Sequence, residues 1–225
     1  MPPKLDNHKK ALQFLKKDVV LKKLIEGVEL KITQADADLY RSLMRSVVSQ
    51  QLSVKAAATI WQRFENLFSN KYPSIDAVLN QSDEALREVG LSKQKASYLK
   101  NIAAFFKENN HKLAHAHLLS DQDLIDLLVN IKGVGKWTVE MILMFSLKRE
   151  DIFPIDDLGI VNGICTLYKV KQSDKKKRNA KLISIAENWR PYRSLACFYI
   201  WQYKSIAPND KQKKPVKKQA LKHAK

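Results

Sequence analysis

Apolar residues recur at three- and four-residue spacing along most of the chain, a pattern typical of helices that bury one face. Lysine and other polar residues separate the apolar positions in the clearest stretches, which are residues 8–25, 38–52, 53–68, 96–106 and 120–128. No stretch shows the strict alternation of apolar and polar residues that a half-buried strand requires. The sequence therefore predicts an all-α fold.

Capping and turn residues mark where several of these helices begin and end. Ser53 is suited to cap the helix that follows it, so Gln50–Leu52 should form a tight corner between two helices. Gly90 is placed to stop a short helix. Ser120 and Asp123 match a capping box. We therefore expect short helices joined by tight turns.

Composition and charge indicate a globular protein with a polyanionic partner. At 225 residues and 45% hydrophobic content, the chain can form one well-filled core or two small ones that share a cleft. The formal net charge of +17 exceeds what solubility requires, and it favours nucleic acid over a membrane as partner. Residues 207–225 are rich in lysine and nearly free of large apolar residues, which predicts a basic disordered tail that adds DNA affinity without specificity.

Export, a membrane span and a side-chain metal site all lack support in the sequence. The N-terminus has no apolar core of a signal peptide, and no apolar run approaches the roughly 20 residues of a membrane span. Cys165 and Cys197 lie in separate apolar runs, as free thiols of a reducing compartment do. We expect an intracellular protein, in the cytoplasm or nucleoid of a bacterium or the nucleus of a eukaryote.

A glycine hairpin, Gly133-Val134-Gly135, separates two helical patterns and is flanked by Lys132 and Lys136. Glycines at alternate positions permit backbone conformations closed to other residues and let another backbone approach. A helix that begins at about Lys136 would point its free N–H groups, up to Thr138, at a phosphodiester. A simple interhelical turn needs only one glycine, so phosphate binding is favoured. The hairpin carbonyls could also hold Na⁺ or K⁺, which residue types alone do not decide.

The stretch LLVNIKGVGKWTVEMILMFSLKREDIFPIDDLGI resembles the helix-hairpin-helix and Gly-Pro-Asp signature of the DNA glycosylase superfamily. It is most similar to the 3-methyladenine DNA glycosylase II branch. The resemblance runs from about Leu39 to Trp201 and includes the motifs SVVSQQLS, GLSKQKASYLK and WRPYRSLACFYIW. Several motifs in the family's order are a specific signal, whereas the GVG triplet alone would be weak.

The resemblance implies a catalytic domain over residues 1–206 that is built from two helical subdomains. One would comprise residues of about 36–140, the other residues of about 1–35 together with 141–206, and the lesion cleft would lie between them. The helical pattern starts by about residue 8, so we expect no N-terminal β domain of the kind some relatives carry.

The resemblance places a catalytic carboxylate just after Pro154, where the choice lies between Asp156 and Asp157. Alignment of IDDLGI with the family motif selects Asp157 and leaves Asp156 as the N-cap of the next helix. The alternative is that both acids serve only as caps, because acids are favoured at helix N-termini. Gly159 and its neighbour four residues on, Gly163, are expected to permit close helix packing.

The resemblance also assigns the lesion pocket and the reaction type. Trp137 stands where bifunctional members carry the Schiff-base lysine, which implies a monofunctional glycosylase. Trp201 matches a tryptophan beside the catalytic aspartate, although packing against Phe198 is an alternative. Met141 and Leu158 line the implied pocket, and these two positions, with Gln202, carry tyrosines in the better-known bacterial member, which leaves the substrate range open.

A base inside a duplex must be flipped out before its glycosidic bond can be attacked, and a side chain must fill the gap. The Gln50–Leu52 corner aligns with the family's intercalating loop, with Gln51 as the best match for the wedge and Leu52 next. The alternative is a polar corner that is merely solvated.

The sequence as a whole predicts a monomeric enzyme that acts on double-stranded DNA containing alkylated bases. It would flip 3-methyladenine-type purines out of the duplex and hydrolyse the N-glycosidic bond, leaving an abasic site. No cofactor is expected, since the four-cysteine cluster of the endonuclease III branch is absent. The rivals are an inactive binder of damaged or bent DNA and a glycosylase for oxidised or mismatched bases. The choice among 3-methyladenine, 7-methylguanine, hypoxanthine and ethenoadenine stays open.

Overall fold

The computed structural model describes residues 5–30 and 38–206. The all-α prediction is confirmed, because helices, turns and loops account for both described ranges and no strand occurs in either. The α-helices are α1 (Leu5–Leu15), α2 (Val19–Gly27), α3 (Leu39–Ser49), α4 (Val54–Glu65), α5 (Ile75–Leu79), α6 (Asp83–Glu88), α7 (Lys93–Glu108), α8 (Asn110–Ala114), α9 (Asp121–Leu128), α10 (Lys136–Phe145), α11 (Leu158–Leu167), α12 (Lys175–Glu187) and α13 (Arg193–Ile206), with 3₁₀ turns η1 (Ser69–Lys71) and η2 (Ala116–Leu118).

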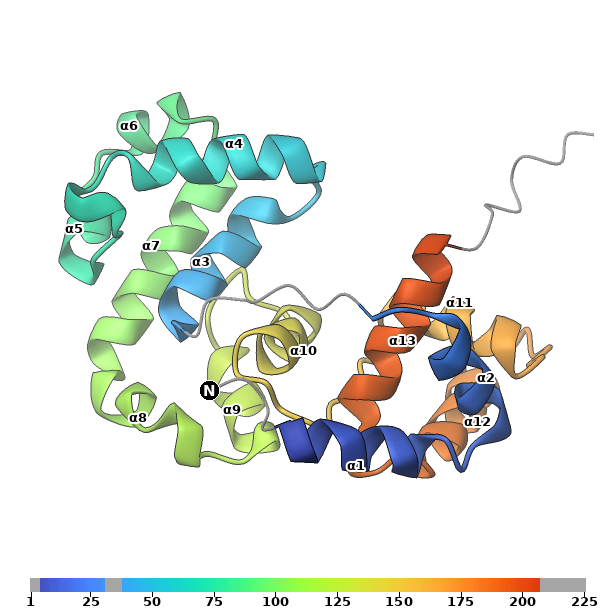
Figure 1. Cartoon of the computed structure of the whole chain (residues 1–225). Coiled ribbons are helices and arrows are strands. Elements are labelled where there is room, and N and C mark those ends of the chain that lie inside the picture. Colours follow the sequence, from blue (N-terminus) through green and yellow to red (C-terminus); the bar gives the residue numbers. More distant parts are fainter. Residues whose placement is uncertain (1–4, 31–37, 207–225) are drawn as a thin grey trace, which may run out of the picture.

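The helices pack in two groups, which lie on opposite sides in Figure 1. In the first group α7 is central and packs against α3, α5, α6 and α8, while α10 packs against α3 and α9. In the second group α13 packs against α11 and α2, and α12 against α11. The first two helices and the last one, α1, α2 and α13, belong to the second group, and the loop between α10 and α11 returns the chain there (Figure 1).

Serine caps start several helices, as their positions in the sequence predict. The Ser53 hydroxyl accepts the N–H of Ala56, and the Ser120 hydroxyl accepts that of Asp123 at 3.1 Å. Gly90 follows α6 with a φ of +103°, the left-handed conformation of a helix stop. A serine cap contributes about 1 kcal/mol. Local sequence therefore determines most helix boundaries in the first group.

Burial of the predicted apolar faces holds each group together. Leu43, Met44 and Val47 of α3 are fully buried, as are Leu99 and Ile102 of α7, which pack in the same core. Removal of such a side chain to alanine costs about 2–5 kcal/mol. The α3–α7 interface is therefore a rigid base for the turns at the ends of both helices.

Polar contacts order the second group around Asp18, which caps α2. Its carboxylate accepts the Tyr168 hydroxyl at 2.7 Å and the Trp189 indole N–H at 3.3 Å. Trp189 is fully buried, and its ring also meets that of Phe153 edge to face. These contacts connect the start of α2 with the end of α11, the turn after α12 and the loop that leads to α11.

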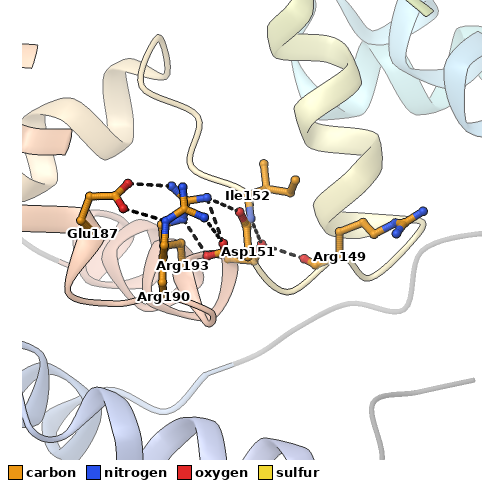
Figure 2. Close-up of polar contacts among 7 residues, drawn as sticks. Arg149, Asp151, Ile152, Glu187, Arg190 and Arg193 are labelled. Carbon is orange, nitrogen blue, oxygen red and sulfur yellow. Dashed lines mark hydrogen bonds and ion pairs between the residues drawn. The ribbon is translucent and has the colours of Figure 1, made fainter. Parts of the chain in front are cut away.

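The loop between α10 and α11 is fastened to the start of α13 (Figure 2). The Arg193 guanidinium donates to both carboxylate oxygens of Asp151 at 2.7 and 3.0 Å, and Arg190 donates to the same carboxylate. The Ser194 hydroxyl accepts the Ile152 N–H at 2.9 Å and donates to the Arg149 carbonyl at 2.7 Å. These bonds fix the path of the chain towards α11 relative to α13.

Helix α10 ends at Phe145. Helix α12 begins at Lys175, because Asp174 caps it by accepting the Lys177 N–H at 2.7 Å. The predicted tail, residues 207–225, lies outside the described residues. No helix within 5–30 or 38–206 is long and apolar enough to cross a membrane.

Candidate active site

The side chain of Asp157 is held by donors from three helices. It is the N-cap of α11, and its Oδ1 accepts the Ile160 N–H at 2.8 Å. The Trp201 indole N–H donates to the same oxygen at 2.8 Å, and the Trp137 indole N–H donates to Oδ2 at 2.9 Å. The carboxylate therefore has a fixed position and orientation between α10, α11 and α13. The predicted cap Asp156 was wrong, since it is exposed and Asp157 caps the helix.

Gly159 makes the approach of Trp201 possible. A Cβ added at this position would lie 3.0 Å from Asp157 Oδ1 and 3.0 Å from Trp201 Cδ1. Contacts this short would push the indole away from the carboxylate. The sequence predicted only a helix-packing role for Gly159. Its position two residues after Asp157 was the signal that could have placed it beside the site.

Two large apolar side chains near Asp157 are exposed: Leu158, the next residue in the chain, and Trp137, whose indole donates to the carboxylate. The side chains of Trp137 and Leu158 are 44% and 74% exposed, although both are large and apolar. Met141 is half-buried against the core. Trp201 stacks on Phe145 with ring centroids 5.7 Å apart and also contacts Phe198, so packing and contact with Asp157 occur together. Exposed aromatic and aliphatic side chains of this kind are suited to stacking with a flat aromatic ligand.

The hairpin has the open helix N-terminus that an anion site requires. Gly135 is the N-cap of α10 and supplies no side-chain acceptor to its first N–H groups. A Cβ added at Gly135 would meet no other atom of the protein within 4 Å. Gly133 has a φ of +102°, and the Val134 N–H donates to the Ile131 carbonyl at 2.9 Å to close the turn.

Only part of the predicted hairpin set exposes its side chains. Lys132 and Lys136 are exposed, whereas Val134 and Thr138 are only about 5% and 4% exposed. The prediction of a DNA contact can therefore hold for Val134 and Thr138 only through their backbones. Their side chains instead pack the hairpin and α10 onto the core.

The predicted wedge residues project from the corner between α3 and α4. Gln51 is exposed and has a φ of +57°, a left-handed conformation that turns the chain sharply. Leu52 is 38% exposed, and Val54 just after it is almost fully exposed. The Gln50 side-chain amide donates to the Gly133 carbonyl at 3.4 Å, so the corner touches the hairpin.

Residues 44–188 match the family described as "HhH-GPD superfamily base excision DNA repair protein". The chain belongs to the HhH-GPD superfamily. Over 199 residues it is 35% identical to DNA-3-methyladenine glycosylase 1 of Schizosaccharomyces pombe, covering 88% of this chain and 86% of that protein.

Solved structures of HhH-GPD proteins agree in fold. The S. pombe 3-methyladenine DNA glycosylase in complex with abasic DNA superposes with a TM-score of 0.75 at 33% identity, covering 88% of this chain and 98% of that one. The DNA-3-methyladenine glycosidase of Bacillus halodurans superposes with a TM-score of 0.74 at 34% identity, covering 86% and 88%. The predicted superfamily and fold are confirmed.

A second acid of this HhH-GPD site was missed in the sequence. Glu140 lies on α10, one turn after Trp137, and is only 4% exposed. Its Oε1 lies 3.7 Å from the Lys136 ammonium, and its Oε2 is buried without a hydrogen-bond partner. Burial raises the pKa of Glu140 to about 6; Lys136 opposes the rise, and Asp156 and Asp157 add to it.

Replacement of Glu140 by glutamine should remove a pH dependence of folding stability. The pKa of Glu140 is higher in the folded than in the unfolded chain, so its stabilising contribution is present below about pH 4.5 and is lost as pH rises through about 6. The loss is on the order of 2 kcal/mol. Urea unfolding from pH 5 to 8 should show wild type losing stability relative to Glu140→Gln across this window. The exposed Glu84→Gln is the control, and parallel curves for wild type and Glu140→Gln would contradict the assignment.

The hairpin carbonyls predicted to bind a monovalent cation already accept side-chain hydrogen bonds in part. The Lys132 carbonyl accepts from the Asn101 amide at 3.3 Å, and the Gly133 carbonyl accepts from Gln50. Sodium or potassium binding at the hairpin stays a prediction. Between residues 5 and 30 and between 38 and 206, no three His, Cys, Asp or Glu side chains gather as a metal site.

Proposed function

We propose that this protein is a base-excision DNA glycosylase that releases alkylated purines of the 3-methyladenine type from duplex DNA. It flips the base out and hydrolyses its N-glycosidic bond. The observation that carries the proposal is the Asp157 carboxylate, oriented by two indoles and a helix N–H beside the exposed Trp137 and Leu158. The similarity to the 3-methyladenine DNA glycosylase of S. pombe and to the DNA-3-methyladenine glycosidase of Bacillus halodurans supports the choice of substrate. A DNA substrate would place the protein in the compartment that holds the chromosome.

The Asp157 carboxylate suits the charge that develops in this reaction. Breaking the bond leaves oxocarbenium-like positive charge on the deoxyribose. A fixed carboxylate about 4 Å away contributes on the order of 4 kcal/mol at an effective dielectric near 20. Oδ1 accepts two hydrogen bonds and Oδ2 one. Oδ2 therefore keeps an acceptor position with which to orient or deprotonate the attacking water.

An alkylated purine makes the remaining requirements modest. Its positive charge makes it a good leaving group, so no strong general acid is needed. The faces of Trp137 and Trp201 can gain about 0.5–2 kcal/mol each from a cationic ring stacked on them. Binding of the flipped base and electrostatic stabilisation by Asp157 are then sufficient for base release.

The reaction should stop at the abasic site. Strand cleavage through a Schiff base needs a side-chain amine at the site. The residue beside Asp157 is Trp137, whose indole nitrogen donates to the carboxylate and is not such an amine. The neighbouring Lys136 instead directs its ammonium to Glu140. We therefore infer a monofunctional glycosylase.

The proposal is tested with duplex DNA treated with a methylating agent. We expect chromatography to detect free methylated purines after incubation with the protein, and denaturing gels to show strand breaks only after alkali or heat. Untreated duplex is the control. Breaks without alkali would indicate a lyase, and binding without release would favour the inactive DNA binder. A panel of oligonucleotides with single 3-methyladenine, 7-methylguanine, hypoxanthine or ethenoadenine lesions then ranks the substrates.

A further inference from the structure

One face of helix α7 supports both of the turns that we propose to contact DNA. Lys95, Tyr98 and Asn101 follow one another at three-residue spacing, so their side chains lie along one side of the helix. Lys95 contacts the corner after α3, and the other two contact the hairpin. We call these three residues the α7 ridge.

Lys95 binds the end of α3 with its ammonium group. The Nζ donates to the carbonyls of Val48 and Gln50, each at 2.7 Å. The last carbonyls of a helix have no helical N–H partner, and a charged donor makes a stronger hydrogen bond to them than a neutral one. Desolvation lowers the pKa of Lys95, because the ammonium is drawn from water to meet the carbonyls. The Lys95 ammonium is thus bound to carbonyls of the protein and is not placed to bind a DNA phosphate.

The rest of the ridge fixes the hairpin. A Cβ added at Gly133 would lie 2.2 Å from Tyr98 Cγ, so the hairpin backbone rests directly on the tyrosine ring. The Asn101 amide donates to the Lys132 carbonyl at 3.3 Å. The Gln50 amide then joins the corner to the hairpin through the Gly133 carbonyl. Helix α7 and the hydrogen bond from Gln50 to Gly133 therefore set the distance between the corner and the hairpin.

We propose that Lys95 is a positioning residue that holds the corner Gln50–Leu52 at a fixed distance from the hairpin, so that Gln51 enters the duplex beside the phosphate that the hairpin binds. The proposal rests on the proposed function. Flipping a paired base costs a few kcal/mol, so the corner must keep its conformation while it enters the base stack. Gln51 is exposed and has a left-handed backbone conformation, so the conformation of the corner depends on contacts made by neighbouring residues. Lys95 supplies such contacts.

The test compares the effect of Lys95→Met on paired and unpaired lesions. We measure single-turnover release of 7-methylguanine from a duplex in which it pairs with cytosine, and from the same duplex with an abasic analogue opposite. An unpaired base is cheaper to flip. We expect Lys95→Met to slow release at least about 10-fold from the paired substrate and less than about 3-fold from the unpaired one. Lys95→Arg, which can still donate to both carbonyls, should recover most of the rate.

Lys107→Met is the matched control. It removes a lysine from the same helix, about 18 Å further along, where the ammonium pairs with Asp76 at 2.8 Å. It should slow both substrates equally and slightly. Gln50→Ala tests the same connection without touching Lys95, and it should give a smaller selective loss. This second variant keeps the proposal testable should Lys95→Met unfold.

Equal slowing of paired and unpaired substrates by Lys95→Met, or no slowing, would overturn the proposal. Failure of the proposed function looks different, because the wild-type protein would release no base from either duplex. In that case, fluorescence of 2-aminopurine placed beside the lesion still reports opening of the duplex. Lower fluorescence with Lys95→Met than with wild type and Lys107→Met would support the positioning role, and equal fluorescence would contradict it.

Discussion

Asp157→Asn should reduce the single-turnover rate of base release about 1000-fold. The substitution keeps the size of the side chain and removes its negative charge. The charge contributes on the order of 4 kcal/mol to the positively charged transition state, and about 1.4 kcal/mol corresponds to each tenfold change in rate. The rate of release from methylated duplex at saturating protein concentration measures the effect directly.

The folded state should tolerate the change. Asparagine is a good N-cap, so its amide oxygen can still accept the Ile160 N–H and the Trp201 indole. The amide nitrogen would then face the Trp137 indole, which is also a donor, at a cost of about 1 kcal/mol. Thermal unfolding should therefore show a small loss of stability beside a large loss of rate.

Asp156→Asn is the matched control for this experiment. It removes the same charge one residue earlier, from an exposed side chain that does not cap α11. Release should change no more than about 3-fold. The assignment of the catalytic role would be contradicted by a normal rate in Asp157→Asn, or by equal losses in both variants.

Local sequence was sufficient for the features that depend on neighbouring residues. The caps Ser53 and Ser120, the stop at Gly90 and the start of α10 after Gly135 all agree with prediction. Each of these depends on the conformational preference or hydrogen bonding of residues within about four positions. Contacts between distant residues are not required, so periodicity and capping rules were enough.

The site needed contacts across long sequence separations. Asp156 and Asp157 have the same chemistry and adjacent positions, so capping rules cannot separate them. The indole of Trp201, 44 residues further on, donates to Asp157, which distinguishes this carboxylate from the exposed Asp156. Glu140 and Lys95 were missed for the same reason, because each resembles a solvated residue of an amphipathic helix until tertiary packing buries it or aims it at carbonyls. The family resemblance selected Asp157 as the candidate and gave no indication of these two.

Gly133→Ala should destabilise the protein severely, by about 2–4 kcal/mol. The added methyl would stand 2.2 Å from Tyr98 Cγ, an atom close to the backbone of α7 that cannot swing aside. Gly133 also has a φ of +102°, which a residue with a Cβ rarely adopts. Overpacking of this kind costs about 1–3 kcal/mol, and the strained backbone adds more. Urea unfolding measures the loss.

Gly135→Ala, the same substitution two residues later, should leave stability almost unchanged and weaken DNA binding instead. Gly135 has a φ of −93°, and its added methyl would meet no protein atom within 4 Å, so stability should change by no more than about 0.5 kcal/mol. The methyl would instead project into the space beside the free N–H groups of α10, where we expect the phosphate. Affinity for duplex DNA containing an abasic analogue should fall at least about 10-fold in a fluorescence anisotropy titration. Unchanged affinity would mean that the DNA backbone does not approach Gly135. A large loss of stability in Gly135→Ala together with a small one in Gly133→Ala would instead show that the hairpin does not rest on Tyr98.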